Sequence, residues 1–228
     1  MEGIDKDDLY KELDQSGPYK RTNSGTLERE AMVVLKKIIT KHTCINFRLR
    51  KEELMKKRLK AFKKQNWPEF QKLILLAKSE FQRLMVEVTQ LAGEFLELDE
   101  STFEASLKEA MQDPLTLRTM GINDEMLRTE IDGENKTLTA DLAKAIIIEK
   151  INIEFEKEAS MTSVRPNSQH EADMIQLVER TKIADQLYLK HGYKLAELEW
   201  ADKKFGIHND PDVQAILKSH LALREQRS

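Results

Sequence analysis

Residues 26–65, TLEREAMVVLKKIITKHTCINFRLRKEELMKKRLKAFKKQ, decide the fold class of this chain. The stretch contains no Gly and no Pro over forty residues. Thr26 is a good N-cap residue, and Asn66-Trp67-Pro68 ends the run because a residue before proline is disfavoured in the α region. At 1.5 Å per residue the stretch corresponds to a rod of roughly 60 Å. It therefore predicts one long helix.

A second long helix is predicted from Pro68 to about Leu98. Its apolar residues recur every three or four positions, which gives a wide apolar stripe. They are Phe70, Leu73, Ile74, Ala77, Phe81, Leu84, Met85, Val88, Leu91, Ala92 and Phe95. Because the break between the two helices is so short, we expect an antiparallel hairpin of coiled-coil type.

Short helices are expected after the hairpin, each with a local start signal. Ser101 and Glu104 have capping-box spacing, and so do Ser168 and Glu171. Asp113-Pro114 and Asp210-Pro211 combine an N-cap residue with a first-turn proline. Turns are predicted at Gly121 and over 131–135, helices over 139–159, 168–191, 194–205 and 211–224, and Gly192 fits a helix C-terminus. The fold class is all-α, with a long antiparallel helical hairpin followed by short-helix modules.

The predicted domain organisation has three parts. Residues 1–25 are expected to form a flexible N-terminal arm with a short helix near 5–14, and residues 26–160 the hairpin plus short helices. Residues 168–228 are expected to form a C-terminal helical module, after a linker over 160–167. At an offset of 97, Leu98 falls on Leu195, Phe103 on Trp200 and Asp113-Pro114 on Asp210-Pro211. This spacing is interpreted either as an internal duplication or as coincidence between two similarly capped helix pairs.

The strongest functional signal is the positive charge of residues 36–64. This window holds twelve Lys and Arg against two Glu, which is a charge of +10, so the other 199 residues carry −13 of the chain's net −3. Plotted at 100° per residue, Ile45, Leu49, Met55, Leu59 and Phe62 form an imperfect apolar arc, with Lys63 inside it and with Phe47 and Leu54 on the polar side. The predicted partner-binding residues are Arg48, Arg50, Lys51, Lys56, Lys57, Arg58, Lys60, Lys63 and Lys64.

This segment has two interpretations. In the first it binds an anionic partner. In the second it is a solvated face whose charge is balanced by the chain's own carboxylates, for instance Glu94, Glu97, Asp99, Glu100 and Glu104. An acidic protein surface, such as the glutamate-rich tails of microtubules, suits a rod-like helix. Nucleic acid is the alternative, although the aromatic residues needed for stacking are few. Calmodulin and an anionic membrane face are further ligands for a basic amphipathic helix.

Other classes of function are disfavoured. A single cysteine, Cys44, forms no intramolecular disulfide and suits a reducing compartment. No stretch approaches the length of a membrane span. The five His residues lack the spacing of di-iron or zinc ligands, and there is no Gly-rich phosphate loop. We therefore expect no catalytic residues, no metal site and no cofactor. The sequence predicts a non-enzymatic, cytoplasmic scaffold or adaptor subunit of a larger complex. Association with the cytoskeleton is one form that this role can take.

Overall fold

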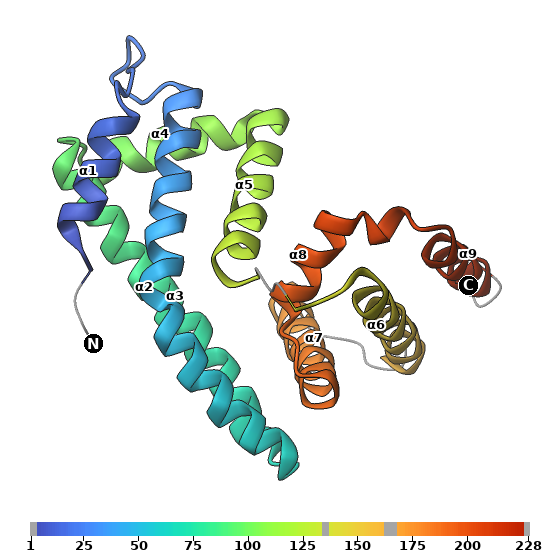
Figure 1. Ribbon diagram of the computed structural model, residues 1–228. Helices are drawn as coiled ribbons and strands as arrows, with labels where there is room; N and C mark the ends of the chain where they lie inside the picture. Colours follow the sequence, from blue (N-terminus) through green and yellow to red (C-terminus); the bar gives the residue numbers. More distant parts are fainter. Residues whose placement is uncertain (1–3, 134–136, 162–167, 226–228) are drawn as a thin grey trace. The chain divides into compact units, whose positions relative to one another are not determined.

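The computed structural model describes residues 4–133, 137–161 and 168–225, and these residues are almost entirely helical (Figure 1). In chain order the helices are α1 (Lys6–Ser16), α2 (Arg29–Lys63), α3 (Trp67–Phe95), α4 (Glu100–Gln112), α5 (Pro114–Asp132), α6 (Ala140–Met161), α7 (Gln169–His191), α8 (Leu195–Phe205), the 3-10 turn η1 (Ile207–Asn209) and α9 (Pro211–Glu225). Within the described residues there is no β-strand, only an isolated bridge between Arg21 and Leu27. The all-α prediction is confirmed.

Most of the predicted helix ends are found where the sequence places them. Asp113 accepts a hydrogen bond from the backbone N–H of Thr116 at 2.8 Å, and α5 begins at Pro114. Ser168 accepts from the N–H of Glu171 and begins α7. Gly192 ends α7 with a φ of 82°, a conformation that glycine adopts without steric cost. These three signals are local, so neighbouring residues alone determine them.

Three local predictions are wrong. Thr26 is not the N-cap of α2, because that helix begins at Arg29 and the Thr26 hydroxyl instead donates to Glu109 at 3.0 Å. The N-cap of α4 is Asp99 rather than Ser101, because the Asp99 carboxylate accepts from both the N–H and the hydroxyl of Thr102. The turn predicted at Gly121 is absent, since α5 continues through it. Glycine inside a helix costs only about 1 kcal/mol, which packing of the neighbouring, buried Met120 can offset. The predicted turn over 131–135 and linker over 160–167 fall partly outside the described residues.

The chain divides into two compact units, each described here by itself. The N-terminal unit comprises residues 4–56 and 75–131, and the C-terminal unit comprises 57–74 and the described residues from 132 onward. The predicted boundaries, at 25/26 and across 160–168, lie elsewhere. The difference arises because residues 57–74, which we call the turn segment, join the last helices rather than the rest of α2 and α3.

The core of the N-terminal unit is formed by α1, α2, α3, α4 and α5. Its buried residues include Leu9, Leu13, Met32, Leu35, Ile39, Val88, Ala92, Leu98, Ala110 and Met120. Leu9 and Leu13 of α1 are completely buried in it. The part of residues 1–25 that forms α1 therefore packs into this core, which differs from the flexible arm that the sequence predicts. The two leucines are four residues apart, so they lie on the same face of α1.

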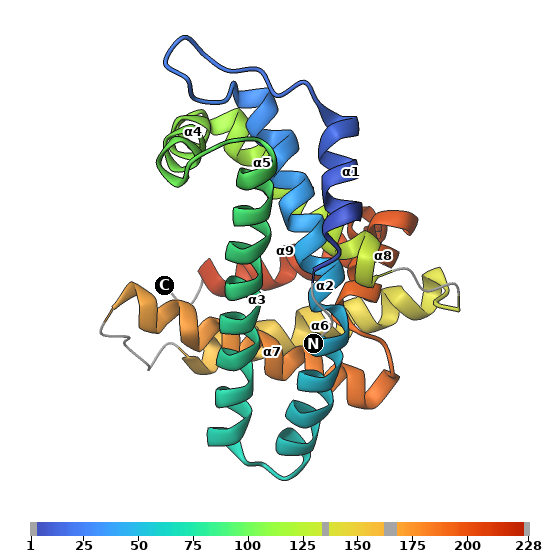
Figure 2. The same ribbon diagram turned by 90° about the vertical axis from the view of Figure 1, so that its left-hand side faces the viewer.

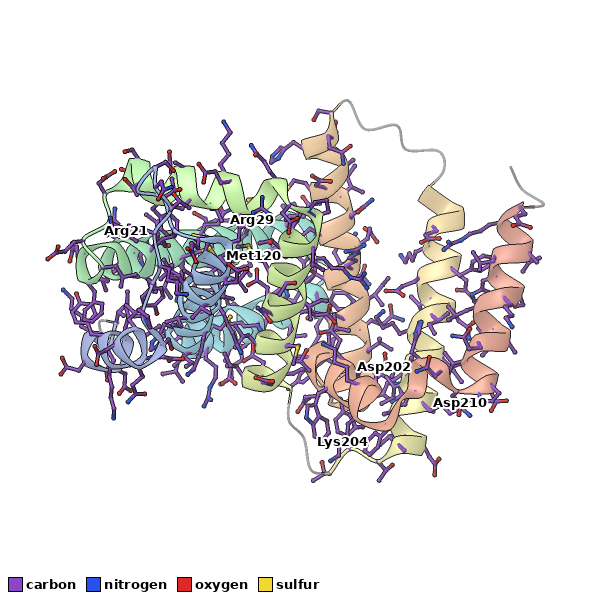
Figure 3. The ribbon with its side chains drawn as sticks, turned by 90° about the horizontal axis from the view of Figure 1, so that it is seen from above. Arg21, Arg29, Met120, Asp202, Lys204 and Asp210 are labelled. Carbon is purple, nitrogen blue, oxygen red and sulfur yellow. The ribbon has the colours of Figure 1, made fainter. Side chains whose placement is uncertain are left out.

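The core of the C-terminal unit is formed by α6, α7, α8, η1 and α9. Its buried residues include Ala143, Ile146, Ile183, Leu187, Leu198, Ala201, Ile207 and Val213. An ion pair also joins α6 to the start of α9, because Lys144 lies 2.7 Å from Asp210, which is labelled in Figure 3, and 2.6 Å from Asp212. The hydrogen bond to Asp210, followed by that to Asp212, raises the pKa of Lys144.

Parts of α2 lie against parts of α3 within each unit (Figures 1 and 2). In the N-terminal unit the rings of Phe47 and Phe81 are 5.5 Å apart, and in the C-terminal unit those of Phe62 and Phe70 are 5.7 Å apart. These ring contacts join α2 to α3 in each unit. The antiparallel hairpin and the internal duplication stay hypotheses.

Candidate functional site

The second half of α2 has a defined inward side. Phe47, Leu54 and Ala61 are buried, and they are separated by seven residues each. A spacing of seven returns to nearly the same side of a helix after two turns. Two arginines, Arg50 and Arg58, occupy positions between them on the same side. The inward side of α2 is therefore part apolar and part cationic.

Arg58 forms a buried ion pair with Asp185 of α7, within the C-terminal unit. Its Nε lies 2.7 Å from Oδ2 of Asp185 and its Nη2 lies 2.8 Å from Oδ1, which is the bidentate geometry that a guanidinium favours. Asp185 is only 1% exposed and stands between the core residues Ile183 and Leu187 on α7. Each member neutralises a charge that would otherwise be costly to bury.

Arg50 is held in the same manner within the N-terminal unit. Its Nε and Nη2 donate to the two carboxylate oxygens of Glu80, on α3, at 2.7 and 2.8 Å, and its Nη1 donates to Glu53 at 3.0 Å. The hydrogen bonds to Glu80 and then to Glu53 raise the pKa of Arg50. Two of the nine predicted partner-binding residues, Arg50 and Arg58, are thus committed to contacts inside the protein.

The other seven predicted residues are exposed. Arg48 and Lys51 lie near the middle of α2. The remaining five, which we call the lysine face, are Lys56, Lys57, Lys60, Lys63 and Lys64. On a helical wheel drawn at 100° per residue, these five lysines cover an arc of about 120°. The centre of this arc lies about 120° around the helix from the centre of the inward positions Phe47, Leu54 and Ala61. None of the five takes part in an ion pair with the residues that the structure describes.

The apolar arc predicted for α2 is wrong in orientation. Leu49, which the sequence places inside the arc, is 69% exposed, and Ile45 is exposed as well. Phe47 and Leu54, predicted on the polar side, are buried, whereas Lys63, predicted inside the arc, is exposed. The inward side also holds the charged residues Arg50 and Arg58, whose carboxylate partners Glu80 and Asp185 lie on other helices and have no signal in the local sequence.

Lys36 and Lys41, near the start of the charged window, form ion pairs within the N-terminal unit, whereas Lys37 is exposed. Lys36 lies 3.0 Å from Asp124, and Lys41 lies 2.8 Å from Glu12 of α1. His42 also contacts Glu12, at 2.9 Å. Burial alone would raise the pKa of Glu12, but the hydrogen bonds and charges of Lys41 and His42 outweigh it, so the pKa lies below 4.5. The solvated positive charge is therefore concentrated toward the end of α2.

An aromatic cluster lies beside the lysine face, in the turn segment. Trp67 makes edge contacts with Phe62 at 5.6 Å and with Phe70 at 6.0 Å between ring centroids. The ammonium of Lys182, from α7, lies 5.0 Å from the centre of the Trp67 ring. These three rings are therefore engaged within the C-terminal unit.

Among residues 4–133, 137–161 and 168–225, no group of three or more His, Cys, Asp or Glu side chains is arranged to hold a metal ion. None of the helices in this part of the chain combines the length and apolar character needed to cross a bilayer. Cys44 is partly buried.

Comparison of the chain with protein-family models, with curated proteins and with solved structures found no match. The lysine face is therefore interpreted from its own residues.

Proposed function

We propose that the protein is a non-enzymatic helical scaffold or adaptor subunit of a larger intracellular assembly, and that the lysine face binds an acidic surface of a protein partner. An acidic filament of the cytoskeleton is one partner of this kind. The remaining, acidic part of the chain would bind another component of the same assembly.

The observation that carries this proposal is the solvation of the lysine face. Five ammonium groups lie within nine residues at and just after the end of α2, exposed and with no ion pair among the described residues. Like charges at a spacing of four residues repel each other by a few tenths of a kcal/mol per pair. Core formation does not need them there, because the inward side of α2 is separate. An anionic partner would remove the repulsion.

A protein partner is favoured over nucleic acid by the state of the neighbouring aromatic rings. Binding of single strands commonly uses exposed aromatic faces on which bases stack. Phe70 is buried, and Trp67, although 39% exposed, contacts Phe62 and Phe70 and lies 5.0 Å from the ammonium of Lys182. The lysine face itself contributes charge without a stacking surface, which suits carboxylates of an acidic protein.

The proposal is tested with defined anionic ligands. We expect the protein to bind a poly-glutamate peptide and microtubules at low salt, more tightly than duplex or single-stranded nucleic acid of matched charge. The triple variant Lys57→Glu, Lys60→Glu, Lys64→Glu should weaken binding to poly-glutamate about tenfold or more, since each exposed pair contributes up to about 1 kcal/mol. Fluorescence anisotropy and co-sedimentation measure these affinities.

A matched control carries the same change in charge elsewhere. Lys11, Lys78 and Lys218 are exposed lysines on α1, α3 and α9, and Lys11→Glu, Lys78→Glu, Lys218→Glu should bind nearly as the unchanged protein does. Equal weakening in both triple variants would show that net charge, rather than the lysine face, governs binding. Tight binding to nucleic acid with a steep salt dependence, and none to acidic proteins, would replace the proposed partner by nucleic acid.

A further inference from the structure

Helix α5, in the N-terminal unit, carries apolar side chains on the side that faces away from the core. Its inward side holds Met120, labelled in Figure 3, and Leu127, both of which are buried. On the outward side Leu115, Ile122 and Met126 are 71%, 47% and 46% exposed. At 100° per residue these three side chains form a row only about 40° wide. A row of this kind is stabilised when another apolar surface removes it from water.

Gly121 lies beside this row, on the same outward side. Helix α5 continues through it, and a Cβ added there would meet no atom within 4 Å among the residues that the structure describes (Figure 1). Glycine destabilises a helix relative to alanine, because its backbone loses more freedom on folding. Neither a turn nor a close contact inside the protein therefore calls for glycine at this position. A missing side chain on the outward side allows a second backbone to come close to α5.

Two opposite charges lie along the middle of the outward side. Arg118 and Glu125 are exposed and seven residues apart, so they lie on nearly the same side of the helix. The midpoint between them falls between Gly121 and Ile122, which places each charge about 5 Å along the helix from that midpoint. Glu125 also interacts within its own chain, and a contact of an exposed carboxylate is weak enough to be exchanged.

These positions are complementary to themselves under a two-fold rotation. If a second α5 lies antiparallel to the first, with the two-fold axis at the midpoint, Arg118 of each copy faces Glu125 of the other. On one flank Ile122 meets Ile122 of the second copy, and Leu115 meets its Met126. On the other flank the two Gly121 residues adjoin and let the backbones approach. Both copies then use the same patch, as an isologous interface requires.

We propose that the protein forms a two-fold symmetric homodimer through the outward side of α5, packed antiparallel against α5 of a second copy. The charges select this occupant, because an arginine and a glutamate placed equally far from one midpoint match an identical helix in reverse. This inference goes beyond the proposed function and does not use the lysine face. A contact of one helix per copy is small for a specific interface, so the dimer is weak and reversible.

A charge exchange tests the dimer in the full chain. Sedimentation velocity at increasing concentration should show a monomer–dimer equilibrium. Arg118→Glu sets glutamate against Glu125 at both contacts, and Glu125→Arg sets arginine against Arg118. Each variant alone should therefore dimerise at least about tenfold more weakly. An equimolar mixture of the two restores both opposite-charge contacts and should dimerise as the unchanged protein does. Circular dichroism confirms that each variant is folded.

A matched control and a glycine replacement sharpen the test. Arg83→Glu changes an exposed arginine on α3 of the same unit and should leave the dimer unchanged. Gly121→Gln has open space in the monomer and favours the helix, so the thermal stability of the dilute protein should rise. The same side chain holds the two backbones apart, so dimerisation should weaken about tenfold or more. A purely structural role of Gly121 would not give these opposite effects.

Three results would overturn the dimer. The first is an unchanged protein that stays monomeric at its highest soluble concentration, and the second is a mixture of the charge variants that dimerises no better than either alone. The third is a monomeric chain that Gly121→Gln destabilises, which would show that another part of the same chain covers α5. The lysine-face variant Lys57→Glu, Lys60→Glu, Lys64→Glu should dimerise as the unchanged protein does, so poly-glutamate binding and dimerisation are tested separately.

Discussion

The two sides of α2 use positive charge in opposite ways. On the inward side, Arg50 and Arg58 reach carboxylates on other helices through paired hydrogen bonds. On the outward side the lysine face is solvated. The choice of residue follows the environment, because a guanidinium forms two parallel bonds with one carboxylate, whereas an ammonium is strongly hydrated and suits an exposed position. Charge reversal should therefore affect folding on one side and association on the other.

The largest effect is expected from breaking the buried pair. Asp185→Ala leaves the partly buried Arg58 without its counter-charge, and we expect the free energy of unfolding to fall by about 3–5 kcal/mol. Urea denaturation followed by circular dichroism measures the change. Replacing both residues, by Arg58→Met with Asp185→Leu, should be close to neutral. A loss below about 1 kcal/mol for Asp185→Ala would show that water reaches the pair.

The orientation of α2 is tested by two leucine truncations. Leu54→Ala should cost about 2–5 kcal/mol of stability because Leu54 is 1% exposed and its removal leaves a cavity. Leu49→Ala, at an exposed position of the same helix, should change stability by no more than about 0.5 kcal/mol. Thermal and urea unfolding of both variants give the comparison. A larger loss of stability for Leu49→Ala than for Leu54→Ala would support the apolar arc that the sequence predicts.

A smaller effect is expected at Glu12, where two basic side chains of α2 meet α1. Its pKa lies below 4.5 in the folded state. A carboxylate whose pKa is lowered by folding stabilises the protein above its unfolded pKa, and this contribution is lost as the pH falls through the folded pKa. Glu12→Gln should therefore cost on the order of 1 kcal/mol at neutral pH and flatten the loss of stability below pH 4.5.

Unfolding curves measured across the acid range test the change at Glu12. Glu104→Gln is the matched control, since Glu104 is exposed, and it should leave the acid dependence nearly unchanged. If Glu12→Gln and the unchanged protein lost stability equally in acid, the contacts of Glu12 with Lys41 and His42 would not contribute to the acid dependence.

The smallest effect on folding is expected on the lysine face. Lys57→Glu, Lys60→Glu and Lys64→Glu should each alter stability by less than about 0.5 kcal/mol, because the side chains are exposed. A stability loss comparable to that of Asp185→Ala would mean that these lysines serve folding, and the contrast between the two sides of α2 would disappear.

Local sequence was sufficient for much of the helical architecture. The Asp113-Pro114 start, the Ser168 cap and the Gly192 end were all predicted, because each depends on hydrogen bonds within a few residues. Prediction from local sequence failed where two cap signals competed. Asp99 and Ser101 are both good N-cap residues. Asp99 accepts the hydrogen bond from the N–H of Thr102, so α4 begins at Glu100. The short break at Asn66 supported the prediction that α2 and α3 are antiparallel. Nothing in the local sequence indicated that the turn segment groups with the last helices.

The amino-acid sequence by itself determined that the chain is helical, where most helices begin and end, and that positive charge gathers in the second half of α2. Only the tertiary structure decided which side of that helix faces inward. Arg58 is separated from Asp185 by 127 positions and Arg50 from Glu80 by 30. Hydrophobic periodicity assigns a charged residue to the surface, and this rule fails when a distant carboxylate neutralises it. The contacts of Arg50 and Arg58 therefore lie on the inward side of α2, and the lysine face lies in solvent.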